Sequence, residues 1–255
     1  MNVLAKTDIG KVREINQDCY YISNENDKLN LYIIADGMGG YSGGEVASNL
    51  AVLTVKKYLD DKIKNKKNLS GEEIAQILKD SFNVAHNVIY EKAKKEKDLE
   101  EMGTTLDVCL IYNNKVYIAH IGDSRIYKLN LSHNNTSIEQ LTVDHSYVQK
   151  LLKEGTITKE EAYNHPRKNM LMKALGGNED FEEPDILVLD LELCDTLMMC
   201  TDGLTNMLRD NEILEIVSKD INLANRNLIQ AANEKGGLDN ITVILLNTKI
   251  LGDGE

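Results

Sequence analysis

The chain has 255 residues, 42% of them hydrophobic, and carries 29 Lys and Arg against 41 Asp and Glu, so its formal net charge is −12. A chain of this size and composition can bury a substantial core, which excludes global disorder. No linker-like tract divides it, so we expect a single domain over residues 1–255. The acidic surplus argues against a general binder of nucleic acid or of anionic membranes.

The four cysteines form no CxxC pair and mostly lie in apolar runs, which predicts buried thiols in a reducing compartment (Cys19, Cys109, Cys194 and Cys200). The amino-terminal stretch lacks the apolar block of a signal peptide. No segment has the roughly 18 consecutive apolar residues that a membrane span needs. We therefore expect a cytoplasmic protein without a membrane partner, and we also expect a monomer.

The first part of the chain predicts strands followed by helices. Residues 17–23 and 29–35 are rich in β-branched and aromatic residues around a turn-like segment, which indicates a strand pair. Helical periodicity follows over 44–64, and a second helix begins at Ser70, whose capping box closes with Glu73. Strand-like runs at 104–112, 115–122 and 124–129 have short connections, so we expect an antiparallel meander.

The second part predicts an insertion and then a return to alternating strands and helices. Residues 145–180 have weak periodicity and a capping pattern from Thr158 to Glu161, which indicates a flap or small helical insertion. The remaining pattern predicts strands and helices at 184–190, 195–201, 210–219, 222–235 and 241–246. This order indicates an α+β fold in which helices cover antiparallel sheets.

Aspartates mark the ends of the apolar runs. Asp36, Asp123 and Asp202 each follow such a run and precede a small residue, and Asp239 comes just before the last strand. An Asp-Gly pair alone is a common turn, but four aspartates at strand ends suggest more than turns. If these ends converge, the carboxylates need neutralisation, and oxygen-only ligation favours Mg²⁺ or Mn²⁺ over Zn²⁺. Spacing alone leaves convergence open.

The same region imitates a dinucleotide-binding fingerprint, with glycines between an apolar strand and a helix. The imitation fails because the third required glycine is Ser42, and because Asp36 would place a negative charge beside the pyrophosphate. About 20 residues further on, Lys56 stands in a helix where an acidic residue should end a strand. We therefore reject nucleotide binding.

Seven blocks in order resemble the metal-dependent Ser/Thr protein phosphatases, the PPM or type 2C family, in its bacterial branch. The resemblance runs from about residue 3 to 247, and its blocks lie at 7–18, 33–48, 102–106, 117–127, 141–146, 197–206 and 236–246. It implies a four-layer α-β-β-α sandwich of two antiparallel sheets flanked by helix pairs. It also implies hydrolysis of phosphoserine and phosphothreonine on proteins by a metal-activated water, without a phosphoenzyme. A bacterial Ser/Thr kinase is expected as the enzyme that it opposes and as one of its substrates.

The resemblance implies a binuclear Mn²⁺ or Mg²⁺ centre. Carried over to this sequence, Asp36 would bridge both ions, Asp202 and Asp239 would hold the first, and the Gly37 carbonyl the second. Asp123 matches a position that, with Asp202, resembles a third and weaker metal site. The alternative is a catalytically inactive module of the same fold that binds phosphoproteins. The intact aspartates argue against this alternative.

Other positions follow the family or depart from it. Arg13 corresponds to the arginine that grips the substrate phosphate, and Asp18 to the acid that orients metal-bound water. Met38 and Tyr41 stand where many members carry histidine, which puts protonation of the leaving group by a histidine in doubt. Gln17 replaces an acidic residue, and weaker metal affinity is the expected consequence.

The histidines have ordinary explanations. We interpret His120 as a satisfied core side chain, because the expected centre has oxygen ligands only. His145 and His165 flank the flap, where a solvated loop is the simpler expectation than substrate contact.

Overall fold

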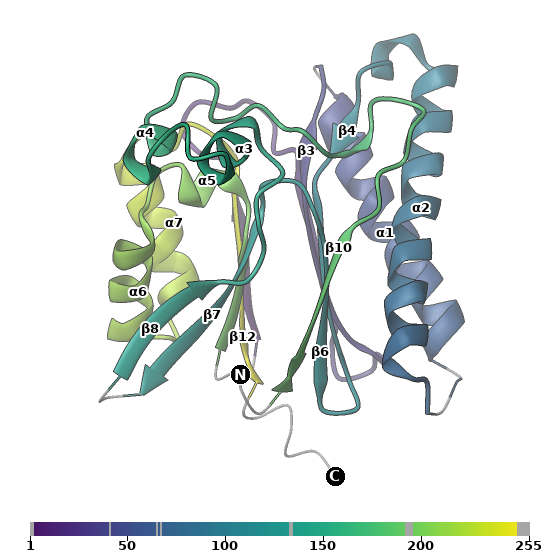
Figure 1. Ribbon diagram of the computed structural model, residues 1–255, viewed down its shortest axis with the longest axis horizontal. Coiled ribbons are helices and arrows are strands. Elements are labelled where there is room, and N and C mark those ends of the chain that lie inside the picture. The colour runs from purple at the N-terminus through teal and green to yellow at the C-terminus, as the bar shows by residue number, and fades with distance from the viewer. Residues whose placement is uncertain are drawn as a thin grey trace.

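The computed structural model describes residues 3–40, 42–64, 66, 68–132, 135–191 and 196–248. Figure 1 shows four layers, with two antiparallel sheets in the middle and a helix pair outside each sheet. Helices α1 (Gly43–Ile63) and α2 (Gly71–Lys95) cover one sheet, and α6 (Asp210–Lys219) and α7 (Ala224–Glu234) cover the other. The predicted α+β sandwich is therefore confirmed.

Within the described residues, one sheet has five strands in the order β1-β12-β11-β7-β8. Their bounds are β1 Val3–Asp8, β12 Ile241–Asn247, β11 Thr196–Cys200, β7 Arg125–Ser132 and β8 Asn135–Gln140. The other sheet has the order β10-β6-β5-β3-β4-β9, with β2 paired to β3. Its bounds are β10 Asp185–Asp190, β6 Lys115–Ile121, β5 Leu106–Tyr112, β3 Asn30–Met38, β4 Gly103–Thr104, β9 Leu175–Gly176 and β2 Asp18–Ile22.

Three apolar layers hold the sandwich together. Along β3 the side chains alternate, so that Leu31 and Ile33 pack against α1 and α2 while Tyr32 and Ile34 pack between the two sheets. The third layer lies between the five-stranded sheet and α6 and α7. Because both faces of the central strands are buried, those strands have nearly continuous apolar sequences.

Several local predictions are confirmed. The β2–β3 pair and the α2 capping box, in which Ser70 and Glu73 bond each other's backbone, are both present. The β5–β6 hairpin turns at Asn113 and Asn114, whose φ values of 49° and 57° suit a tight turn of the primed type. Cys109 and Cys200 are buried as predicted, Cys19 is only half-buried, and Cys194 lies outside the described residues.

The predicted meander is wrong beyond β6. Strand β7 pairs with β11 and β8 in the five-stranded sheet, not with β6. The chain crosses from one sheet to the other at Gly122-Asp123-Ser124, where Gly122 adopts a φ of +120°. A Cβ there would lie 2.5 Å from the Thr105 side chain, so only glycine permits this corner. The crossing places Asp123 between the two sheets.

The flap insertion is confirmed between β8 and β10, over the open end of the sandwich (Figure 1). It contains α3 (Tyr147–Lys153) and α4 (Lys159–Tyr163), and the capping box of Thr158 and Glu161 begins α4 as predicted. Three strands and two short helices were not predicted: β1, β8, β9, the 3-10 helix η1 (Lys97–Leu99) and α5 (Asp202–Thr205). None of the helices in the described ranges is long and apolar enough to cross a membrane.

Candidate metal centre

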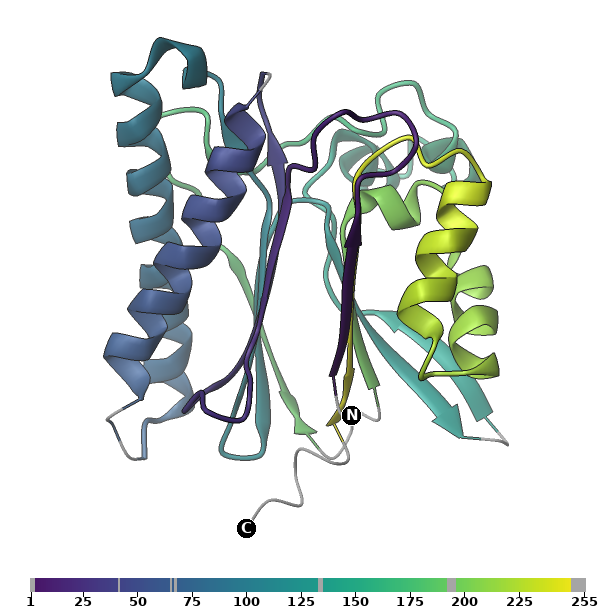
Figure 2. The ribbon, with the colours of Figure 1, turned by 180° about the vertical axis from the view of Figure 1, so that it is seen from behind.

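The site lies at the end of the sandwich below the flap, where the loop from β1 to β2 passes from one sheet to the other (Figure 2). A cavity of about 410 Å³ opens there. Its lining includes six of the seven predicted site residues: Arg13, Asp36, Gly37, Asp123, Asp202 and Asp239. Segments far apart in the sequence are therefore brought together as the strand-end pattern suggested.

Asp36 enters the cavity from within β3 and not from beyond its end, because the strand continues to Met38. Its backbone is fixed on both sides by Thr105, whose Oγ1 accepts from Asp36 N at 2.9 Å and whose N donates to Asp36 O at 2.9 Å. Gly37 follows where the chain is tightly packed, since an added Cβ would lie 2.0 Å from the Gly44 carbonyl oxygen. The glycine thus permits β3 and the start of α1 to approach closely.

Asp123 is held by contacts on both sides of the sheet crossing. The neighbouring Ser124 Oγ lies 3.0 Å from Thr105 Oγ1, so the same threonine supports both Asp36 and the Asp123 corner. The Asp123 side chain is almost buried, with 8% of the residue exposed.

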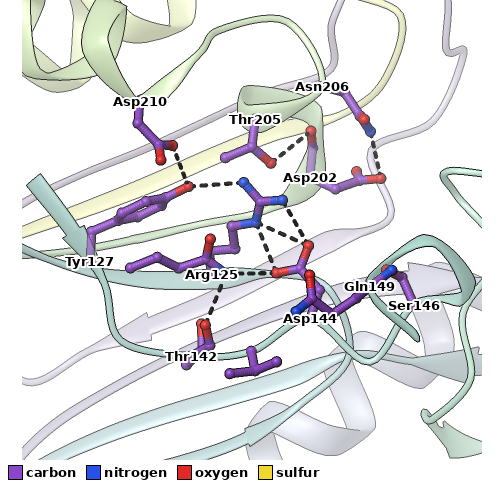
Figure 3. Close-up of polar contacts among 12 residues, drawn as sticks. Arg125, Tyr127, Thr142, Asp144, Ser146, Gln149, Asp202, Thr205, Asn206 and Asp210 are labelled. Carbon is purple, nitrogen blue, oxygen red and sulfur yellow. Dashed lines mark hydrogen bonds and ion pairs between the residues drawn. The ribbon is translucent and has the colours of Figure 1, made fainter. Parts of the chain in front are cut away.

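Asp202 and Asp239 come from adjacent strand ends of the five-stranded sheet. Asp202 begins α5 and is separated from β11 only by Thr201, and Asp239 is separated from β12 only by Asn240. Gly203 permits their approach, because a Cβ there would lie 1.9 Å from the Asn240 carbonyl oxygen. Asn206 Nδ2 donates to Asp202 Oδ2 at 2.8 Å (Figure 3), and Asp202 Oδ1 is buried with no hydrogen-bond partner.

Asp18 lies opposite Asp36 in the β2–β3 register and is half-buried, outside the cavity lining. Thr201 and Thr242 each donate a hydroxyl hydrogen bond to Asp18 Oδ2, at 2.9 and 2.6 Å. Asp18 Oδ1 is buried without a hydrogen-bond partner. Asp18 therefore supports the site from behind Asp36, with one oxygen still available for a further contact.

Arg13 and Asp239, predicted for different ligands, bind one another. Arg13 Nη2 donates to Asp239 Oδ2 at 2.7 Å, with side chains 49% and 25% exposed. Gln17 also lines the cavity, and its Nε2 donates to the carbonyl oxygens of Gly39 and Gly40 at 3.4 and 3.3 Å. A carboxylate at position 17 could not make these donations, so the glutamine holds the glycine-rich loop directly.

Four of the carboxylates, those of Asp18, Asp36, Asp123 and Asp202, have raised pKa values because their side chains are buried close together. Burial is the main cause for each, and it raises the pKa of Asp18 to about 7 and of Asp202 to about 6. Burial, followed by the charges of Asp18 and Asp202, raises the pKa of Asp36 well above its usual value. For Asp123, burial and then the charge of Asp202 act in the same direction. Such a cluster requires either protons or cations.

This donor set fits hard divalent cations. The carboxylates offer oxygen ligands, and the unpartnered Oδ1 atoms of Asp18 and Asp202 supply unused acceptors. In the described part of the chain, however, no three Asp, Glu, His or Cys side chains already surround one point as a finished cation cage. A cation held by three of these side chains would therefore require side-chain rotation.

The histidines contribute no ligand to this cavity. His120 is confirmed as a core residue, with Nδ1 2.5 Å from Asp107 Oδ1 and Nε2 3.1 Å from Val143 O. The expectation of a solvated His145 is wrong, because its side chain is 10% exposed and its ring stacks on His120 at 4.7 Å. His165 is half-buried beside Tyr147. Met38 lies at the end of β3 and lines the cavity, whereas Tyr41 is outside the described residues.

Sequence reasoning missed the residues that support the carboxylates. Asn240 accepts from Gln17 N at 2.9 Å and donates to the carbonyl oxygens of Ile9 and Ile15, which ties the β1–β2 loop to the start of β12. Thr105 holds the Asp36 backbone, and Thr201 and Thr242 hold the Asp18 carboxylate. The available signal was adjacency, since Thr201 and Asn240 directly neighbour Asp202 and Asp239.

Comparison with known proteins decides the family. The model of the protein phosphatase 2C family matches residues 11–236. The chain belongs to the protein phosphatase 2C family. It is 40% identical to the serine/threonine phosphatase stp of Listeria welshimeri over 258 residues, covering 100% of this chain and 99% of that protein.

Solved structures agree with this membership. The structure of the serine/threonine phosphatase Stp1 from Staphylococcus aureus has a TM-score of 0.84 at 32% identity, covering 97% of this chain and 95% of that one. The catalytic domain of the serine/threonine protein phosphatase PstP, in complex with two manganese ions, has a TM-score of 0.79 at 33% identity, covering 96% of each chain. As a 2C family member, this chain is a metal-dependent serine/threonine protein phosphatase, and the alternative of a catalytically inactive module finds no support.

Proposed function

We propose that the cavity hydrolyses phosphoserine and phosphothreonine in proteins through cations held by Asp36, Asp202 and Asp239. The observation that carries this assignment is the enclosure of these carboxylates, from both sheets, beside the exposed Arg13. Asp36 would hold both ions, and they would offset the burial and the neighbouring charges of Asp18 and Asp202 that raise its pKa. The Gly37 carbonyl, which lies in the cavity lining, would offer a ligand to the second ion.

The ions are Mn²⁺ or Mg²⁺, which suit an oxygen-only donor set. The two manganese ions bound to PstP support the pair. Asp123 and Asp202 line a common stretch of the cavity, and we assign a third, weaker ion to them.

Bound cations would lower the pKa of water for in-line attack on phosphorus and neutralise charge on the phosphoryl oxygens. The chain's own contribution is binding and orientation. Arg13 offers a planar fork of N–H donors to two phosphate oxygens once it turns from Asp239. Asp18, fixed by Thr201 and Thr242, presents its free Oδ1 as an acceptor for a water proton.

Direct hydrolysis without a phosphoenzyme agrees with the described lining of the cavity. The hydroxyl there belongs to Thr105, and it is already bonded to the Asp36 backbone and to Ser124. No cysteine or histidine is among the lining residues that the structure describes. A covalent intermediate on a hydroxyl, thiol or imidazole would therefore require a group that this part of the cavity does not offer, and the aspartates, which could form an acyl phosphate, are assigned to the cations.

The same proposal covers the biological setting. The substrates are phosphorylated proteins, including a Ser/Thr kinase that the enzyme opposes, and nucleic acid and membranes are not partners. Residues 1–255 act as one catalytic domain, as a monomer in the cytoplasm. The thiols of Cys19 and Cys200, which form no disulfide, are consistent with a reducing compartment.

The test is Mn²⁺-dependent hydrolysis of p-nitrophenyl phosphate and of a phosphothreonine peptide, with and without EDTA. Asp239→Asn should lose activity and, by calorimetry, Mn²⁺ binding. Asp190→Asn is the matched control, because Asp190 is a 63% exposed carboxylate paired with Lys115 on β10 and β6. Equal behaviour of the two variants, or activity that survives EDTA, would exclude the assigned centre.

A further inference from the structure

A second cavity, of about 500 Å³, lies beside the catalytic one. It is enclosed by α3 and α4 of the flap on one side and by α5 and the start of α6 on the other. Asp123 and Asp202 line both cavities, so the two are continuous. A phosphorylated residue in the first cavity is attached to polypeptide on both sides, so part of its chain must lie near the second.

The second cavity offers apolar surface to a ligand. Val148 and Leu152 from α3, Ala162 and Tyr163 from α4, and Leu208 contribute to its lining. Val148, Ala162 and Leu208 keep only 9%, 7% and 2% of their surface exposed, so the packing beneath the cavity is firm. The Tyr163 hydroxyl donates to Asn206 O at 3.3 Å, which joins the flap wall to the opposite wall.

The acidic side chains around this apolar surface are already paired. Arg125 holds Asp144 through three hydrogen bonds of 2.7 to 3.1 Å, and Tyr127 donates to Asp210 at 3.0 Å (Figure 3). On the flap side, both Glu160 oxygens accept from Arg209, at 2.7 and 2.8 Å. The carboxylates left without a cationic or hydroxyl partner are Asp123 and Asp202, which belong to the proposed metal centre.

The flap also places positive charge beside the apolar surface. Residues 145–180 carry six Lys and Arg against five Asp and Glu, in a chain whose net charge is −12. Lys159 and Lys168 belong to this set and line the cavity. These two lysines place positive charge on the cavity wall of an acidic protein, where it attracts an anionic substrate toward the apolar surface.

We propose that the second cavity is a substrate subsite that takes a large apolar side chain, such as Leu or Phe, of the phosphorylated segment close to the phosphorylated residue. This inference rests on the proposed function and adds a sequence preference to it. Burial of such a side chain favours binding by an amount that corresponds to about a ten-fold lower KM than for alanine at the same position.

The test uses phosphothreonine peptides in which one position at a time, from four before to four after the phosphothreonine, is Ala, Leu, Phe or Asp. The Mn²⁺-loaded wild type should show about a ten-fold lower KM for Leu or Phe over Ala at a position on one side. The proposed subsite is overturned if no position shows a lower KM for Leu or Phe than for Ala, or if Asp is preferred. If the Mn²⁺-loaded wild type does not hydrolyse p-nitrophenyl phosphate, the proposed function itself is refuted.

Leu152→Trp provides a second test, since Leu152 is half-buried and lines the cavity. Filling the cavity should remove the preference for Leu or Phe and lower kcat/KM for the preferred peptide relative to p-nitrophenyl phosphate. Leu151→Trp is the matched control, because Leu151 has the same burial class on the same helix but is outside the lining. It should keep the preference; retention in both variants would overturn the proposal. Should Leu152→Trp not fold, the wild-type peptide series still decides.

Discussion

Gly122 and His145 are joined by two hydrogen bonds: His145 N donates to Gly122 O at 2.7 Å, and Gly122 N donates to His145 Nδ1 at 3.1 Å. As an acceptor, Nδ1 carries no proton, so the hydrogen-bond pattern assigns the proton to Nε2, which lies 3.3 Å from Asp185 Oδ2. Burial lowers the pKa of His145 to about 4, which keeps this neutral form at neutral pH. The flap base thereby holds the corner that carries Asp123.

His145→Ala should therefore destabilise the protein by about 1–3 kcal/mol, because the Gly122 N–H loses its acceptor in a buried corner. His145→Asn should be milder, since the Asn Oδ1 can accept from the same N–H group. Urea denaturation at pH 7.5 measures both. Equal destabilisation by the two variants would mean that ring packing on His120, and not the hydrogen bond, is what matters.

The buried carboxylates predict an unusual pH dependence in EDTA. The pKa of Asp18 is about 7 in the folded protein and near 3.8 when unfolded, so between these values the folded state holds a proton that the unfolded state releases. Its contribution to stability therefore falls as pH rises from about 4 to 7. Asp18→Asn should gain stability over the wild type as pH rises through this window. Parallel stability curves from pH 5 to 8 would contradict the assigned burial.

Arg13 should affect phosphate and metal in opposite ways. Arg13→Ala should lower kcat/KM by about 10- to 100-fold, because charge-assisted hydrogen bonds to the phosphate are lost. Arg13→Lys should recover part of this, since it keeps the charge but not the planar fork. The Mn²⁺ concentration for half-maximal activity should not rise in either variant, because the Arg13 guanidinium no longer competes with the ion for the Asp239 carboxylate. A parallel loss of metal affinity would place Arg13 in a structural role.

Gly203 couples two of the proposed ligands. In Gly203→Ala the new Cβ would meet the Asn240 carbonyl oxygen at 1.9 Å, so β11 and β12 must separate at their ends. We expect a stability loss of about 1–3 kcal/mol together with weaker Mn²⁺ binding by calorimetry. Gly71→Ala serves as control, because its Cβ would make an ordinary contact of 3.4 Å with Tyr117. Normal metal binding by Gly203→Ala would disprove the coupling.

The Arg125–Asp144 pair should show strong coupling in a double-mutant cycle. The Asp144 side chain is 11% exposed, so Arg125→Met leaves a nearly buried carboxylate unpaired and should cost about 3–5 kcal/mol. Adding Asp144→Asn should restore part of that stability. Strictly additive losses, measured by urea denaturation, would show that the pair is solvated in solution.

The sequence predicted those features that depend on local pattern. Periodicity located α1, α2 and the β5–β6 hairpin, and the aspartates at strand ends marked the cavity. It failed at β7, because a strand's partner is set by side-chain packing between sheets and not by the length of the preceding turn. It also missed Thr201 and Thr242, since a threonine in a strand has the same sequence signature whether its hydroxyl meets solvent or Asp18.

The chain passes between sheets at Asp123 and again in the Arg13 loop, so the acidic cavity is assembled from both halves of the sandwich. Neither sheet alone carries all the carboxylates of the cavity. A shift of one sheet relative to the other would separate Asp36 from Asp202 and Asp239. The rate of turnover therefore depends on how the two sheets pack against each other. Mutations in the apolar layer between the sheets, even far from the cavity, should change that rate.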